Sequence, residues 1–254
     1  MTTITLTETP LLHAILARAD DALVHAHRLS EWCGHAPMLE EELALANVAL
    51  DLLGQARALY QYAAGIEGRG GTEDDLAYLR DAPAFRNALL LEQPNGDFAQ
   101  TIARLFLHSA AILPWWQAAM RSTDPTLAAI AAKAEKEVAY HLRHAGEWMI
   151  RLGDGTAESH ARAQAALDRL WPFTAEILAP DDADLVARGV LPDAAALRAD
   201  WDATIARVLA LATLERPRDG WMQSGGRRGL HTEHLGHMLA VMQHLQRAYP
   251  GATW

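Results

Sequence analysis

The chain has 254 residues, of which 50% are hydrophobic, and a formal net charge of −10 at pH 7. So large a hydrophobic fraction excludes a disordered chain, and the negative charge argues against nucleic acid and anionic membrane surfaces as partners. The single cysteine, Cys33, cannot form an internal disulfide; because it follows Trp32 at the end of an apolar stretch, we expect a small buried side chain in a protein of a reducing compartment.

The amino terminus carries no sign of export. The first ten residues, MTTITLTETP, have neither the basic nor the apolar segment of a secretion signal. No apolar run approaches the ~20 residues that a membrane-spanning helix requires. We therefore expect a soluble, cytoplasmic protein.

Helical patterns dominate the first part of the chain. Thr9 and Pro10 are suited to an N-cap and a first helical position, and they open a helix that should stop near Gly34. The next helix, at about 39–64, is apolar on nearly every side. A helix of this kind is typically the central one of a bundle.

A segment rich in glycine, proline and charge, residues 65–96, leaves room for two short helices. Residues 97–100 then have the pattern of a capping box and open a third long helix, which Pro114 should kink or end. Asp124 and Pro125 are expected to start a fourth long helix, which runs to Leu152. Three further helices are expected at about 158–170, 193–214 and 231–248.

Two of the long helices carry incomplete metal-binding motifs. Residues 51–54 (DLLG) and 138–141 (VAYH) have the placement and three-residue step of the E-x-x-H element with which ferritin-like bundles hold two irons. The first motif has Gly54 where the histidine belongs, and the second has Val138 where the glutamate belongs. We therefore expect an all-α fold, a ferritin-like helical bundle with additional C-terminal helices, in a single domain spanning residues 1–254.

The remaining ligand positions are depleted as well. A ferritin-like site takes one carboxylate from each of two helices and an E-x-x-H pair from each of the other two, because two irons need about four carboxylates. The first helix can supply Glu31 and the second Asp51; the third offers His108, one turn after Arg104, and the fourth His141. Two carboxylates and two imidazoles carry too little negative charge for two irons, so we expect no metal in this chain.

The same residues also fit roles outside a di-iron site. A buried Asp51 needs a partner, and His108, His141 or Arg104 could pair with it. His141 could be a satisfied core histidine, and Glu31 a solvated charge near a helix end. The alternative is an enzyme in its own right, in which His108, His141 and one of the two carboxylates hold a single iron. An iron-storage protein would need the intact di-iron site, which is missing.

Two groups near the carboxyl terminus are candidate contact sites. His231, His234 and His237 repeat every three residues and could in principle hold zinc, although a polar face or a contact with another protein chain also explains them. Arg227 and Arg228 follow two glycines and precede a helix in an otherwise acidic chain, an arrangement that fits contact with a partner or an anion, or else a merely solvated loop. No P-loop, G-x-G-x-x-G or G-x-S-x-G element supports a nucleotide-binding or hydrolase function.

Six stretches of the sequence carry a likeness to a known family. They are LSEWCGHAP (29–37), LALANVALDLLGQA (43–56), LLLEQPNGDFAQTIAR (89–104), YHLRH (140–144), RLGDGT (151–156) and GGRRGLHTEHLG (225–236). Together they resemble the C subunits of bacterial 1,2-phenylacetyl-CoA epoxidases. The likeness extends from about Leu11 to Trp254 in the same order and spacing.

The resemblance implies a ferritin-like fold and a role in aerobic phenylacetate degradation, within a multicomponent monooxygenase that epoxidises the ring of phenylacetyl-CoA. In that family a related A subunit holds the di-iron site, and the C subunit is its non-catalytic structural partner. The E-x-x-H elements of the A subunit fall on residues 51–54 and 138–141 here. The departures at these elements and at His108, with Asp51 shortened, favour a chain without activity or cofactor of its own. Such a chain would join the A subunit and the other subunits in a hetero-oligomer.

Overall fold

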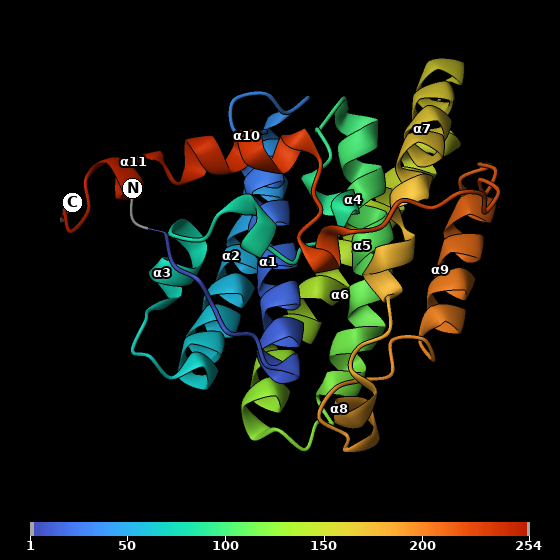
Figure 1. Cartoon of the computed structure of the whole chain (residues 1–254). Helices are drawn as coiled ribbons and strands as arrows, with labels where there is room; N and C mark the ends of the chain where they lie inside the picture. The colour runs from blue at the N-terminus through green and yellow to red at the C-terminus, as the bar shows by residue number, and fades with distance from the viewer. Residues whose placement is uncertain (1–2, 253–254) are drawn as a thin grey trace.

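Two antiparallel helical hairpins form the centre of the molecule in the computed structural model, which describes residues 3–252 (Figure 1). In the first hairpin, α1 (Pro10–Ser30) packs along α2 (Leu39–Glu67). In the second, α5 (Phe98–Ala119) packs along α6 (Pro125–Gly153). Each hairpin closes through a short connection, so its two helices lie antiparallel.

A long crossover joins the two hairpins. It contains α3 (Glu73–Tyr78), the 3-10 turn η1 (Ala82–Ala84) and α4 (Leu89–Glu92), in the region where the sequence predicts two short helices. One long crossover between two helix pairs is the connectivity of ferritin-like bundles.

Capping residues begin three of the long helices where the sequence predicts, although the capping box predicted at 97–100 forms only in part, because the Gln100 side chain donates to the Pro94 carbonyl. Thr9, Asp97 and Asp124 each accept a hydrogen bond from the backbone amide three residues further on, at the first turns of α1, α5 and α6. Each cap satisfies an amide that has no partner inside its own helix. Gly68, with a φ of 75°, ends α2 in the left-handed conformation that glycine adopts most readily.

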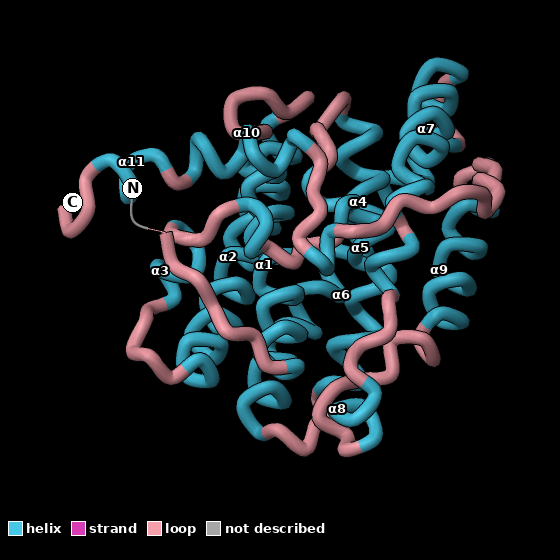
Figure 2. The backbone as a smooth tube through the Cα atoms, in the orientation of Figure 1, coloured by secondary structure: helices cyan, strands magenta, loops and turns pink. Residues whose placement is uncertain are grey.

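The remaining elements cover the hairpins. α7 and α9 pack against α5 and α6, and the Trp201 indole donates a hydrogen bond of 3.1 Å to the Leu107 carbonyl, which anchors α9 to α5. α10 and α11 lie across the crossover, beyond a long loop that Figure 2 shows running over the surface. The elements are α7 (Ala157–Leu170), η2 (Trp171–Phe173), η3 (Ala175–Leu178), α8 (Ala183–Ala187), α9 (Arg198–Leu211), η4 (Gly226–Arg228), α10 (Glu233–Met242) and α11 (His244–Ala248).

One hydrophobic cluster runs through the helices, from Leu12 in α1 to Leu239 in α10. Its largest fully buried members include four tryptophans: Trp115, Trp116, Trp171 and Trp201. Over residues 3–252 the backbone consists of helices and loops, so the prediction of an all-α bundle is confirmed (Figure 2). No helix in this part of the chain is long and apolar enough to cross a membrane.

Two local predictions are wrong. Of the two alternatives at Pro114, a kink or an end of the helix, the end is wrong: α5 continues through Pro114 to Ala119, and Trp115 and Trp116 beyond the missing amide are buried in the core. Cys33 is exposed rather than buried, because α1 already ends at Ser30.

The prediction that α2 is the central helix is also wrong. Leu43 and Leu50 on this helix expose 57% and 63% of their surface. The opposite side of α2 packs into the bundle, with Leu45, Val48 and Leu52 buried. A helix that is apolar all round normally lies inside a core, so α2 presents an apolar stripe that the chain itself leaves uncovered.

Candidate functional site

Asp51 and His141 join the two hairpins at the degenerate motifs. The Asp51 carboxylate lies 3.0 Å from His141 Nε2, so the predicted pairing of Asp51 is confirmed, with His141 as its partner. The His141 side chain is 1% exposed, whereas that of Asp51 is 38% exposed, so the expectation of a buried aspartate is wrong. Burial lowers the pKa of His141, although the hydrogen bond and the charge of Asp51 oppose this effect. The pair therefore closes the seam between α2 and α6 at the surface.

Neither of the two positions that lack a ligand, Gly54 and Val138, offers a group that binds a metal. The Lys133 ammonium lies 3.8 Å from the point where a side chain at Gly54 would begin. Val138 is fully buried and offers only methyl groups. On the same seam, Gln55 donates a hydrogen bond of 2.9 Å to Glu137, which lies 3.6 Å from Lys133. The seam is thus filled by contacts between protein side chains.

His108 pairs with a residue that the sequence analysis missed, His25 of α1. The two Nδ1 atoms are 3.3 Å apart, the rings meet edge to face, and neither Nε2 atom has a hydrogen-bond partner in the described part of the chain. Burial lowers the pKa of His108 to about 4, against an opposing effect of Asp21, and burial also holds the pKa of His25 well below its usual value. Both rings are therefore neutral, and one Nδ1–H donates to the other Nδ1. His25 lies three residues after Ala22 and four before Leu29, and this helical spacing is the sequence signal for its burial.

Glu31 and Arg104 form hydrogen bonds at one end of the bundle and do not belong to a metal site. Glu31 accepts hydrogen bonds from Arg28, at 2.8 Å, and from Asn95, at 2.9 Å. Arg104 donates to the Gln93 carbonyl at 2.6 Å, and burial lowers its pKa to about 9. Neither residue contacts Asp51.

These positions do not fit two irons. Among residues 3–252, no group of three or more His, Cys, Asp or Glu side chains is arranged to hold a metal ion. The arrangement also gives no support to a single iron on His108, His141 and a carboxylate, since His108 faces His25 and Asp51 already bonds to His141. At Asp51, His141, His25 and His108 the structure shows hydrogen bonds between helices.

The C-terminal histidines do not meet in a zinc site. His231 lies between the Glu92 carboxylate, 2.8 Å from Nδ1, and the Phe85 carbonyl, 3.0 Å from Nε2. Burial would lower the pKa of His231, but the hydrogen bond and charge of Glu92 outweigh it and raise the pKa. His237 is exposed at the outer side of α10. His231 therefore anchors the loop before α10 to α4, and His234 supplies only its backbone carbonyl to Arg28.

The two neighbouring arginines have different roles. Arg227 donates to both oxygens of Asp21, at 2.9 and 2.7 Å, and to the carbonyls of Ala17 and Arg86. The prediction of a free contact residue is therefore wrong for Arg227, because its donors are used inside the fold. Arg228 is exposed, and its role as a partner or anion contact stays a prediction.

An exposed apolar and basic surface lies on α2 and α6, the helices that carry Asp51 and His141. On α2 it consists of Leu39, Leu43 and Leu50, and on α6 of Tyr140 with the basic residues that flank it; we call it the α2–α6 face. The two stripes adjoin, since the Lys133 ammonium of α6 lies 3.8 Å from the point where a side chain at Gly54 of α2 would begin. The basic residues of the face are Lys133, Lys136, Arg143 and Arg151.

Comparisons with known proteins agree with the resemblance in the sequence. A family model described as phenylacetic acid catabolic protein matches residues 2–254, which include every degenerate ligand position. The C subunit of the 1,2-phenylacetyl-CoA epoxidase of Escherichia coli (strain K12) is 50% identical over 241 residues. That alignment covers 94% of this chain and 97% of the Escherichia coli protein.

Proposed function

The chain belongs to the family of phenylacetic acid catabolic proteins, and from this premise we propose that it is the C-type subunit of a 1,2-phenylacetyl-CoA epoxidase. In this role it has no activity or cofactor of its own and supports a related A subunit that holds two irons. The hydrogen bond between Asp51 and His141 carries the proposal, because it uses two former ligand positions to join two helices. A cytoplasmic location belongs to the proposal and is supported by the lone, unpaired Cys33.

The donor chemistry supports a structural role. Two irons require about four carboxylates, and the ligand positions of this chain supply Asp51 and Glu31 only. Glu31 is engaged with Arg28 and Asn95. The mostly exposed ammonium of Lys133 lies beside Gly54 and adds positive charge next to this position.

The α2–α6 face is the surface that we assign to the A subunit. Its leucines form an apolar stripe on a long helix, and obligate interfaces between subunits are rich in such surface. Its basic rim favours a partner with acidic side chains around an apolar helix. Pairing through this face would bring the helices of the A subunit against a rigid hairpin, which would hold the iron-binding helices in position.

The experiment is reconstitution with the A subunit. We expect the purified chain to hold well under one equivalent of iron, and to co-purify with an A subunit that holds two. The double variant Asp51→Asn, His141→Gln should leave epoxidation by the assembled complex close to the wild-type rate, because both replacements can still form hydrogen bonds. Loss of epoxidation by a complex that still assembles and still carries iron in its A subunit would reject the structural role.

A single-iron enzyme predicts the opposite results. Iron would stay bound to the isolated chain after treatment with a chelator, and the double variant would lose both the iron and the activity. Iron storage predicts many irons per chain, which the same metal analysis would detect.

A further inference from the structure

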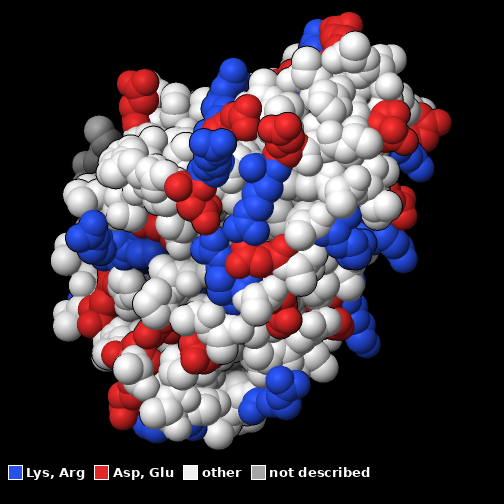
Figure 3. Space-filling model, turned by 90° about the vertical axis from the view of Figure 1, so that its right-hand side faces the viewer, with Lys and Arg blue, Asp and Glu red and all other residues white. Residues whose placement is uncertain are grey.

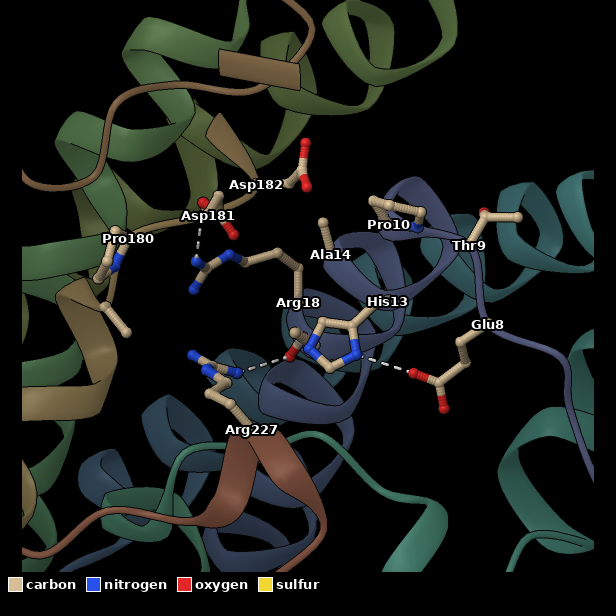
Figure 4. A pocket seen from close by; sticks show the side chains of 12 residues that line it. Glu8, Thr9, Pro10, His13, Ala14, Arg18, Pro180, Asp181, Asp182 and Arg227 are labelled. Atoms are coloured by element: carbon tan, nitrogen blue, oxygen red, sulfur yellow. Dashed lines mark hydrogen bonds and ion pairs between the residues drawn. The ribbon is translucent and has the colours of Figure 1, made fainter. Parts of the chain in front are cut away.

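A cavity of about 450 Å³ opens between the start of α1 and the segment that joins η3 to α8 (Figure 4). This volume lies in the range of ~300–1,000 Å³ that is usual for small-molecule sites. Small apolar side chains form much of its wall, among them Pro10, Ala14 and Pro180. The cavity is separate from the Asp51–His141 seam, and the proposed assembly makes no use of it.

Arg18 is the unusual residue of this cavity. Its side chain is only 4% exposed, yet its contacts with Asp21 and Asp181 measure 3.4 and 3.6 Å, and its buried Nε has no hydrogen-bond partner among residues 3–252. Hydrogen bonds between a guanidinium and a carboxylate normally measure ~2.7–2.9 Å. Burial lowers the pKa of Arg18, and the nearby carboxylates only partly offset this effect. The buried cation is therefore incompletely paired.

The surrounding residues hold the guanidinium in place without saturating it. The Trp115 ring lies 4.8 Å below the guanidinium carbon. Asp21 is already engaged by both terminal nitrogens of Arg227 and by the Ala88 amide, at 2.7 to 2.9 Å. Figure 4 shows Arg18 extending from α1 toward Asp181 along the wall of the cavity. Arg18 thus has donor capacity at a fixed position, whereas both terminal nitrogens of Arg227 are bonded to Asp21.

We propose that this cavity binds a small monocarboxylate, whose carboxylate accepts a hydrogen bond from Nη2 of the Arg18 guanidinium and whose apolar body packs against Pro10, Ala14 and Pro180. A multiply charged anion is disfavoured, because Glu8, Asp181 and Asp182 also line the cavity. A single negative charge, by contrast, completes the pairing of one buried cation. The proposal concerns the isolated chain and does not depend on assembly with an A subunit.

Calorimetric titration of the full-length chain tests the proposal. The probes are acetate, hexanoate, phenylacetate, the neutral isostere phenylacetamide, and inorganic phosphate. We expect saturable binding of one molecule of phenylacetate or hexanoate per chain. Phenylacetamide should bind at least about tenfold more weakly, because it lacks the charge that strengthens a hydrogen bond to arginine.

Two variants locate the site. Ala14→Leu fills the cavity and keeps every charge, so it should weaken binding at least about tenfold. Ala161→Leu makes the same change on the exposed side of α7 and serves as the matched control, with wild-type affinity. Arg18→Lys keeps the charge but removes the planar guanidinium, and it should also weaken binding. An unchanged melting temperature for Ala14→Leu shows that the fold survives, so the result does not depend on the stability of the Arg18 variant.

Three results would overturn the proposal. One is the absence of saturable binding for all three carboxylates. Another is undiminished affinity in Ala14→Leu. The third is phosphate or phenylacetamide binding as tightly as phenylacetate, since the site would then not select a single negative charge.

Discussion

The histidine pair between α1 and α5 couples the protonation of two single residues to folding. In the folded chain the pKa of His108 is about 4, against 6.5 for an unperturbed histidine, and that of His25 is also depressed. The unfolded chain therefore takes up protons on these rings from about pH 6.5 downward, while the folded chain does not. Their contribution to stability is complete above pH 6.5 and is lost as the pH falls toward 4. His231, whose pKa is raised, acts in the opposite direction and stabilises the fold below pH 6.5.

The double variant His25→Leu, His108→Leu should remove most of this acid sensitivity. Each proton that only the unfolded state binds costs about 1.4 kcal/mol per pH unit. Replacing both partners with apolar side chains of similar size should cost little at pH 7.5, because no donor is left without an acceptor. Urea unfolding at pH 7.5, 6 and 5 measures the effect. The exposed His237→Leu is the control, and equal slopes in all three proteins would contradict the prediction.

At the scale of elements, η4 is anchored by Arg227 rather than displayed for a partner. Arg227→Ala breaks a mostly buried ion pair and leaves Asp21 without its main cation, so we expect a loss of about 3 kcal/mol in the free energy of unfolding. Arg228→Ala removes an exposed side chain and should change stability by less than about 0.5 kcal/mol. Chemical denaturation of the two single variants compares them directly. Equal effects would show that the hydrogen bonds of Arg227 do not hold this segment.

A second prediction at this scale concerns the uncovered apolar stripe of α2. Leu50→Glu should leave the melting temperature nearly unchanged and weaken association with the A subunit by about tenfold or more, because it places a charge in the apolar part of the interface. Leu211→Glu makes the same change at an exposed leucine of α9 and is the matched control. Association measured by surface plasmon resonance decides between the two sites. An equal loss in both variants would indicate a nonspecific effect of charge.

Some of these elements could be predicted from the sequence and others could not. Capping residues and apolar periodicity are local signals, so Thr9, Asp97 and Asp124 were identified as helix starts. The outward side of α2 could not be predicted, because a helix that is apolar all round has no polar stripe to mark the solvent. The continuation of α5 through Pro114 depends on packing contacts that lie outside the helix.

Some features of the candidate site could likewise be predicted from the sequence, and others could not. The loss of ligands at Gly54 and Val138 is visible in the sequence, because residue type alone decides coordination. The choice of His141 as the partner of Asp51, and of His25 as the partner of His108, depends on how the hairpins meet. The contact of Arg227 with Asp21 spans most of the chain and left no local pattern.

At the scale of the whole molecule, the charge is distributed unevenly: the chain is acidic overall, but one helix carries a basic stripe. The net charge is −10, and the face drawn in Figure 3 shows basic and acidic side chains interspersed rather than gathered into one field. The outer side of α6 is different, since Lys133, Lys136, Arg143 and Arg151 follow one another along it with Glu147 among them. Arg143 and Arg151 also lie over the rings of Tyr140 and Trp148, which holds their guanidinium groups near the surface.

A local basic stripe on an acidic protein should act mainly on the rate of association. A partner with acidic side chains is attracted to the stripe over about one Debye length, ~8–10 Å at moderate salt, while the rest of the molecule repels it. We therefore expect Arg143→Glu to slow association with the A subunit several-fold at low ionic strength, and the difference from wild type to shrink as salt is added. Arg207→Glu, on the exposed side of α9, changes the net charge by the same amount and is the matched control. Stopped-flow association rates at two salt concentrations separate the effect of net charge from that of the local stripe. Equal slowing in both variants would mean that net charge governs the encounter. Slowing in Arg143→Glu alone would assign the effect to the α2–α6 face.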